Sequence, residues 1–184
     1  MISAFNETAA KESVERYSDI PGELALRIYT SRLIGRNPDL VLHGGGNTSV
    51  KLSKKNILKE NLEILYVKGS GVDLASIDPK GFCGLDVDFL RKLRNLDSLS
   101  DEEMENQLEI RKVEWLSPNP SVEALLHAFL PHKYIEHTHA DSVLILTNQK
   151  HGRSLIKKAL GSKVAVLPYT MSGLPLAKEV VAQY

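Results

Sequence analysis

The chain has 184 residues, 42% of them hydrophobic, which indicates one folded domain with a sizeable core rather than a disordered chain. The 23 Lys and Arg residues balance the 23 Asp and Glu residues, so net charge gives no reason to expect nucleic acid or a membrane as a partner. The one cysteine excludes an internal disulfide, and the sequence has no signal-peptide pattern and no apolar run of about 18 residues. We therefore expect a cytoplasmic protein.

The first helix with a clear pattern is predicted over residues 21–34. Pro21 suits a first helical turn, apolar residues recur on one side of the segment, and Gly35 ends it. Two strands follow, over residues 48–52 and 62–67. The second of them, Leu-Glu-Ile-Leu-Tyr-Val, has the composition of a strand on a pleated surface.

Each of these strands adjoins a loop of small residues. Residues 43–49, His-Gly-Gly-Gly-Asn-Thr-Ser, lead into the first strand, and residues 68–71, Lys-Gly-Ser-Gly, follow the second. Glycine lets a backbone turn tightly, and exposed N–H groups in such turns can hold an anion. Either loop alone is equally well explained as a plain connection, and neither has P-loop or Rossmann spacing. Together they suggest one phosphate held between them.

The second half of the chain is predicted to be mostly helical. Ser100 and Glu103 match a capping box, and Gly161 ends a later helix. The last helix reaches Tyr184 without a terminating glycine or proline, so we expect a fold that is incomplete at this end. Alternating helices and short strands indicate an α/β layered domain. Helices are predicted over residues 86–95, 100–117, 121–130, 141–147, 150–160 and 174–184, and a strand over residues 164–167.

His137 and His139 are separated by one residue and follow a strand-like stretch. Side chains at i and i+2 leave the same face of an extended segment, so both imidazoles can point at one metal ion. Upstream, Glu123 and His127 lie one helical turn apart and share a helix face. A bare His-x-His is more often a pair of ordinary polar residues, and Glu123 also suits a helix N-terminus by charge alone. The combination with two glycine loops favours a metal site.

These motifs, in this order and spacing, resemble those of the class II aldolase/adducin family over almost the whole chain. Within the family, the chain is most similar to the aldolase half of bifunctional rhamnulose-phosphate aldolase/alcohol dehydrogenase proteins. The resemblance implies a single domain over residues 1–184, a three-layer α/β/α sandwich with a mostly antiparallel central sheet, and a homo-oligomer, often a tetramer. It rests on residues 43–49, 68–71, 117–131 and 137–141.

The resemblance also implies roles for individual residues. His137 and His139 match zinc ligands, and Glu123 matches the catalytic acid/base. Val122 stands where family members often have a second small hydroxyl residue, so one phosphate donor is missing. The residues that match phosphate-binding positions are Gly46, Asn47, Ser70, Gly71 and Ser121.

A third zinc-binding histidine is expected in this family, in a strand later than residue 184. We therefore expect a domain truncated before that histidine, with weak zinc binding and little turnover. Four other histidines are weak substitutes for the missing ligand: His43, His127, His132 and His151. Of these, His127 is better explained as a residue that supports the metal ligands without binding the metal itself.

The function that these features predict is zinc-dependent cleavage of a ketose 1-phosphate of the rhamnulose- or fuculose-phosphate type. Its products would be dihydroxyacetone phosphate and an aldehyde. One alternative is a pentulose-phosphate epimerase or a dehydratase, which uses the same metal and phosphate contacts. The other is a non-catalytic, adducin-like interaction module, which a missing ligand favours and the intact Glu123, His137 and His139 disfavour. The expected partner is a small sugar phosphate, with no nucleic acid and no membrane.

Overall fold

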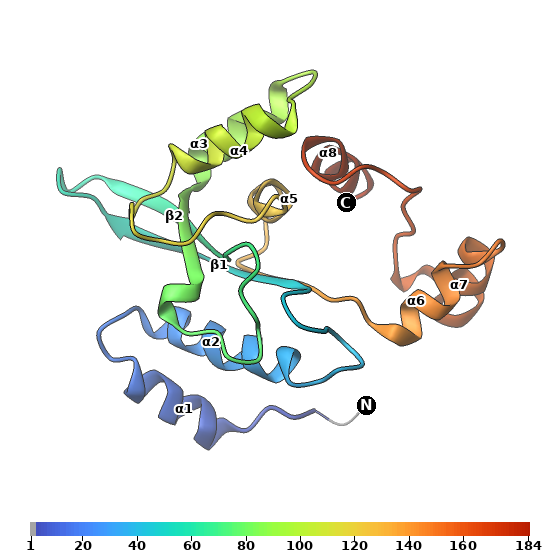
Figure 1. Ribbon diagram of the computed structural model, residues 1–184, viewed down its shortest axis with the longest axis horizontal. Coiled ribbons are helices and arrows are strands. Elements are labelled where there is room, and N and C mark those ends of the chain that lie inside the picture. Colours follow the sequence, from blue (N-terminus) through green and yellow to red (C-terminus); the bar gives the residue numbers. More distant parts are fainter. Residues whose placement is uncertain (1–2) are drawn as a thin grey trace.

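The computed structural model describes residues 3–184 and has a four-stranded antiparallel sheet at its centre (Figure 1). The strand order β3-β2-β1-β4 places β1 between β2 and β4. The predicted α/β class with an antiparallel sheet is confirmed. The four strands are β1 (Asn47–Lys55), β2 (Asn61–Lys68), β3 (Phe82–Asp86) and β4 (Tyr134–His137).

Two N-terminal helices cover one face of the sheet. They are α1 (Glu7–Arg16) and α2 (Gly22–Gly35), which lie below the sheet in Figure 1. Ile28 of α2 is fully buried against Val50 of β1 and other apolar side chains of the sheet. α2 begins where the sequence predicts a helix, with Pro21 at the position before its first turn.

Four helices cover the opposite face and form the third layer. They share a core with the inward side chains of β2 and β3, in which Leu65, Leu85 and Leu125 are fully buried. The capping box predicted from Ser100 and Glu103 is present. The helices of this layer are α3 (Val87–Lys92), α4 (Asp101–Glu109), α5 (Ala124–Phe129) and α8 (Leu174–Gln183).

Two further helices, α6 (Asp141–Thr147) and α7 (Gly152–Leu160), stand to one side of these layers in Figure 1. No residue of α6 is buried. Within residues 3–184, no helix combines the length and apolar character needed to cross a membrane. Short 3-10 segments occur at Pro79–Gly81, Leu93–Asn95 and Gly161–Lys163.

One strand is missed, and two predictions about single elements are wrong. β3 is missed by the sequence analysis, because Phe-Cys-Gly-Leu-Asp is buried on both faces and shows no alternation. The helix predicted to end at residue 117 ends at Glu109, since the chain then runs along β3, where Val113 N–H donates to Gly84 O at 2.9 Å. Residues 164–167 form no strand; Val164 is 39% exposed, and the segment pairs with no strand within residues 3–184.

The outer strand β4 is anchored to α2 by one buried cation. Arg27 is 3% exposed, and its guanidinium donates to Glu136 Oε1 at 2.6 Å and to Ile135 O at 3.4 Å. The same group donates to Thr30 Oγ1 at 2.6 Å. A second, exposed ion pair, Lys133 with Glu23, joins the same two regions.

We expect Arg27→Met to lower the free energy of unfolding by about 1–3 kcal/mol, because several charge-assisted hydrogen bonds are lost together. Lys133→Met is the matched control and should change it little, because its ion pair is in solvent. Urea unfolding followed by circular dichroism measures both. Equal effects of the two substitutions would show that Arg27 does not anchor β4.

Candidate active site

His137 and His139 converge, as their spacing predicts. Their ring centroids are 4.8 Å apart, with an angle of 60° between the ring planes. The prediction that both lie on one strand is wrong for His139, because β4 ends at His137. Beyond the strand, the backbone is bound to the loop that follows α2: His139 N–H donates to Leu40 O at 2.8 Å. Sequence spacing therefore gives the right ring arrangement without a strand at His139.

Glu123 lies beside this histidine pair, at the N-terminal end of α5. Its Oε2 atom is 2.9 Å from His137 Nδ1, which links the helix to the end of β4. Burial alone would raise the pKa of the Glu123 carboxyl, but the hydrogen bond with His137 and the nearby imidazoles hold this pKa below its ordinary value. With the proton of His137 on Nδ1, its Nε2 atom keeps a lone pair for a metal ion.

His127, one turn beyond Glu123, is completely buried and does not reach the surface. Its Nδ1 atom is 2.7 Å from Ser49 Oγ on β1, and its Nε2 atom has no hydrogen-bond partner within residues 3–184. Burial lowers the pKa of His127 to about 4, so the ring is neutral at neutral pH. The residue braces α5 against β1 behind Glu123, as the sequence analysis favours.

The two glycine loops touch each other at the same end of the sheet. A Cβ atom on Gly44 would lie 3.2 Å from Gly71 O, so the two backbones are in contact. Gly46 and Gly71 both have positive φ, at 68° and 72°, which few other residues adopt readily. Within residues 3–184, the N–H groups of Gly46 and Gly71 have no hydrogen-bond acceptor. Free N–H groups in adjoining turns are suited to an anion.

The first glycine loop also adjoins the histidines. A Cβ atom on Gly45 would lie 3.3 Å from His139 Nδ1, so this ring lies against the loop. Asn47, the next residue after the loop, pairs with His137 in the sheet, and its buried Oδ1 atom has no partner within the described residues. An anion site and a histidine pair are therefore neighbours.

The other two predicted phosphate residues lie on connected segments. Ser70 N–H donates to Asn119 O at 2.9 Å, which ties the second glycine loop to the segment before α5. Ser121 is 8% exposed, and its Oγ atom accepts a hydrogen bond from Glu123 N–H at 3.2 Å. This contact leaves the Ser121 hydroxyl proton available to another acceptor.

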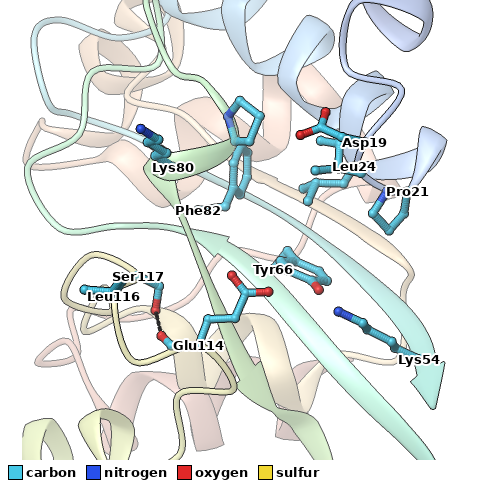
Figure 2. A pocket seen from close by; sticks show the side chains of 12 residues that line it. Asp19, Pro21, Leu24, Lys54, Tyr66, Lys80, Phe82, Glu114, Leu116 and Ser117 are labelled. Carbon is cyan, nitrogen blue, oxygen red and sulfur yellow. Dashed lines mark hydrogen bonds between the residues drawn. The ribbon is translucent and has the colours of Figure 1, made fainter. Parts of the chain in front are cut away.

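A separate pocket of about 520 Å³ lies on the side of the sheet covered by α2. Figure 2 shows Glu114 and Lys54 on either side of Tyr66 in this pocket. None of the eight residues predicted for the site lines it. The histidine–glutamate group instead lies near the molecular surface, with the His137 side chain 35% and the Glu123 side chain 27% exposed.

Comparison with known proteins decides the family. The model of the "Class II Aldolase and Adducin N-terminal domain" matches residues 26–184. The chain belongs to the class II aldolase and adducin family. Its fold is also that of a solved N-terminal class II aldolase domain of a conserved protein from Thermoplasma acidophilum, with a TM-score of 0.80 and 45% identity. That match covers 86% of this chain and 73% of the solved chain.

One curated relative is an uncharacterized oxidoreductase, YuxG, of Bacillus subtilis strain 168. It is 36% identical over 166 residues, which cover 90% of this chain. The chain spans 24% of that relative's length. The similarity therefore concerns one class II aldolase domain and not the whole of the longer protein.

Class II aldolases generally use a divalent metal ion, and the donors present fit part of such a site. Two converging imidazoles are suitable first ligands for zinc, and a carboxylate hydrogen-bonded to one of them is a common supporting group. A catalytic zinc usually has three protein ligands. Within residues 3–184, no group of three or more His, Cys, Asp or Glu side chains is arranged to hold a metal ion.

Several contacts of the site escaped the sequence analysis. Lys68 follows a predicted strand and was grouped with a glycine loop, but nothing in its spacing shows that its side chain reaches the other loop. The contact between His127 and Ser49 joins residues 78 positions apart. The polar composition of the first strand, Asn-Thr-Ser-Val-Lys, beside a largely apolar second strand is the one sequence signal that indicates a polar contact there.

We expect His127 to make the protein less stable in acid. Its folded pKa of about 4 lies below its ordinary value of 6.5. Between these values the unfolded chain binds a proton that the folded chain does not, so stability falls as pH drops from about 6.5 towards 4. A pKa difference of one corresponds to about 1.4 kcal/mol, so the fall from 6.5 to about 4 makes the loss on the order of 3 kcal/mol by pH 4.

The measurement is urea unfolding at several pH values. His127→Asn should flatten the dependence on pH, because Asn can retain the contact with Ser49 but does not titrate. Leu125→Ala, a core substitution on the same helix, should lower stability equally at every pH. An unchanged pH dependence in His127→Asn would assign the acid sensitivity to other groups.

Proposed function

We propose that this chain is a zinc-dependent class II aldolase domain that cleaves a ketose 1-phosphate to dihydroxyacetone phosphate and an aldehyde. The observation that carries the proposal is the convergence of His137, His139 and Glu123 beside two touching glycine loops. Membership of the class II aldolase family agrees with lyase chemistry in general. The likeness of residues 117–131 to the rhamnulose-phosphate branch supports a rhamnulose- or fuculose-type substrate.

The glycine loops would hold the phosphate end of the substrate. The free N–H groups of Gly46 and Gly71 can donate to phosphate oxygens, and the hydroxyls of Ser70 and Ser121 can add two further donors. Asn47 would contribute its side-chain amide. Rotation of this amide by half a turn places its NH₂ group where the oxygen lies, so it could donate to the phosphate. Holding this remote end fixes the bond to be cleaved relative to Glu123.

His137 and His139 would hold the metal, with Glu123 keeping the His137 ring oriented through Nδ1. When bound, a divalent metal ion stabilises the negative charge that develops at the substrate carbonyl. Cleavage removes a hydroxyl proton from one fragment, which leaves as the aldehyde, and returns a proton to carbon on the other fragment. Glu123, which its lowered pKa keeps ionised, would accept that hydroxyl proton and then donate it to the carbon.

A second candidate is a non-catalytic interaction module of the adducin type. The absence of a three-residue metal group within the described residues favours it. Zinc binding separates this candidate from an enzyme, and product analysis separates an aldolase from a pentulose-phosphate epimerase or a dehydratase. The relative's name, oxidoreductase, applies to a protein of which this chain spans a quarter, so it suggests no reaction for this domain.

We also propose that the chain forms homo-oligomers. The apolar residues Val143, Leu144 and Ile145 of α6 are 41%, 42% and 65% exposed, which is unusual for a run of neighbouring apolar side chains. The candidate site lies near the surface, where a second copy can close it against water. Sedimentation velocity over a range of concentrations tests this, and a monomer at every concentration contradicts it.

The test of function is zinc titration together with an assay for dihydroxyacetone phosphate from rhamnulose 1-phosphate and fuculose 1-phosphate. We expect zinc to bind weakly and turnover to be slow, because two imidazoles are available rather than three ligands. His139→Ala should abolish zinc binding. Glu123→Gln should reduce turnover by about 10²- to 10⁴-fold and leave zinc affinity within about tenfold, because its main role is proton transfer.

His151→Ala is the control, because His151 lies at the exposed start of α7. It should leave both quantities unchanged, and a loss of zinc would instead identify it as a ligand. If Glu123→Gln loses zinc affinity more than about a hundredfold, Glu123 acts mainly by orienting His137. If zinc does not bind at all, the aldolase proposal fails and the interaction module remains.

A further inference from the structure

Lys68, the last residue of β2, has its side chain buried between the two glycine loops. The residue is 2% exposed. Its ammonium group donates to Gly44 O in the first loop at 2.9 Å and to Val72 O, just after the second loop, at 2.8 Å. A third, longer contact of 3.5 Å reaches Gly69 O. One side chain thus bonds to the backbone of both loops.

The number of donors excludes Lys68 as a direct phosphate ligand. A lysine ammonium has three N–H donors and no acceptor, and three carbonyl oxygens surround this one. No donor is left for a ligand while these contacts persist. Lys68 therefore differs from a phosphate-binding lysine, whose ammonium contacts the phosphate oxygens themselves.

The same contacts prepare the loops for an anion. Carbonyl oxygens carry partial negative charge and would repel a phosphate, while N–H groups attract it. The ammonium group of Lys68 donates to the carbonyl oxygens of Gly44, Gly69 and Val72, so a cation offsets the partial negative charge of these three groups. The free N–H groups of Gly46 and Gly71 belong to these same two loops.

The backbones of the two glycine loops are in van der Waals contact, so a small change in the distance between them would cause a clash or a gap. The position of a Cβ atom on Gly44 lies within 3.2–3.4 Å of three atoms of Gly71. Burying an ammonium group costs free energy, and burial lowers the pKa of Lys68, although Glu123 and Asp73 oppose that change. A methionine of similar length would fill the space without that cost, so packing alone does not explain a lysine here.

We propose that Lys68 is a positioning residue that couples the two glycine loops, fixing their spacing so that N–H groups of both bind one phosphate group. This inference rests on the proposed phosphate site and adds how that site is kept open to an anion. It predicts that the two loops gain or lose order together, although 24 residues separate Lys68 from Gly44 in the sequence.

The experiment compares Lys68→Met with wild type in two measurements. In the first, inorganic phosphate is titrated into the chain and followed by NMR; we expect Lys68→Met to weaken binding at least tenfold. In the second, amide hydrogen exchange is measured without any ligand. We expect exchange to rise at least tenfold in both residues 43–47 and residues 69–72, while the amides of β1 and β2 away from the loops keep their protection.

Lys112→Met is the matched control. Its side chain is also largely buried, at 9% exposed, but it pairs with Glu109 at 3.1 Å, and within residues 3–184 it forms no hydrogen bond with either loop. It should leave phosphate affinity within twofold and exchange of the loops unchanged. If Lys68→Met does not fold, Lys68→Gln takes its place, because its amide keeps two N–H donors on a shorter side chain.

The outcomes separate this inference from the proposed function. If wild type binds no phosphate, the phosphate site is wrong, but exchange in the two loops still decides whether Lys68 couples them. If wild type binds phosphate and the variant binds it equally well, Lys68 is not a positioning residue. A rise in exchange confined to residues 69–72 would also overturn the coupling, because it would show a contact that matters to one loop alone.

Discussion

The pairing of β1 with two antiparallel neighbours is the constraint on which the candidate site depends. In antiparallel pairs the start of one strand lies beside the end of the next, so the start of β1, the end of β2 and the end of β4 meet at one end of the sheet. The first glycine loop precedes β1, the second follows β2, and His137 ends β4. A change in the register of Asn47 with His137 would move the histidine away from both loops.

Polar groups buried around β1 make that register specific. On one face, Ser49 contacts His127 and Lys51 donates to His132 O at 2.8 Å; on the other, Thr48 Oγ1 is 2.7 Å from Ser31 Oγ. A slip by one residue would exchange the two faces and leave these groups buried without partners. β2 buries the four apolar side chains Ile64, Leu65, Tyr66 and Val67, whereas β1 buries only Val50 and Leu52, so β2 contributes more apolar burial and β1 more of the specific polar contacts.

Electrostatics at the site favours an ionised carboxylate at Glu123 and a neutral imidazole at His127. Burial would raise the pKa of Glu123, but its hydrogen bond with His137 and the nearby imidazoles together lower it, and His127 has a lowered pKa because it is fully buried. Lys68 brings a positive charge close to Glu123 without offering it a hydrogen bond. The site thus combines a carboxylate that can accept a proton, two imidazoles with donor atoms suited to a metal ion, and a buried cation bound to backbone carbonyls, an arrangement that suits the metal-assisted chemistry proposed for an anionic substrate.

The sequence by itself determined the local features. It placed α2 and the capping box of α4, and it located the glycine loops at strand ends. It also predicted converging rings for His137 and His139. All of these features depend on neighbouring residues and on local periodicity. Tertiary structure decided the rest. β3 exists because β2 and the segment before residue 114 supply its hydrogen bonds. Residues 164–167 form no strand because no strand within residues 3–184 pairs with them. Lys68 joins two loops because antiparallel pairing of the strands brings those loops together. Such contacts link residues far apart in the chain, and no local pattern encodes the partner that each one needs.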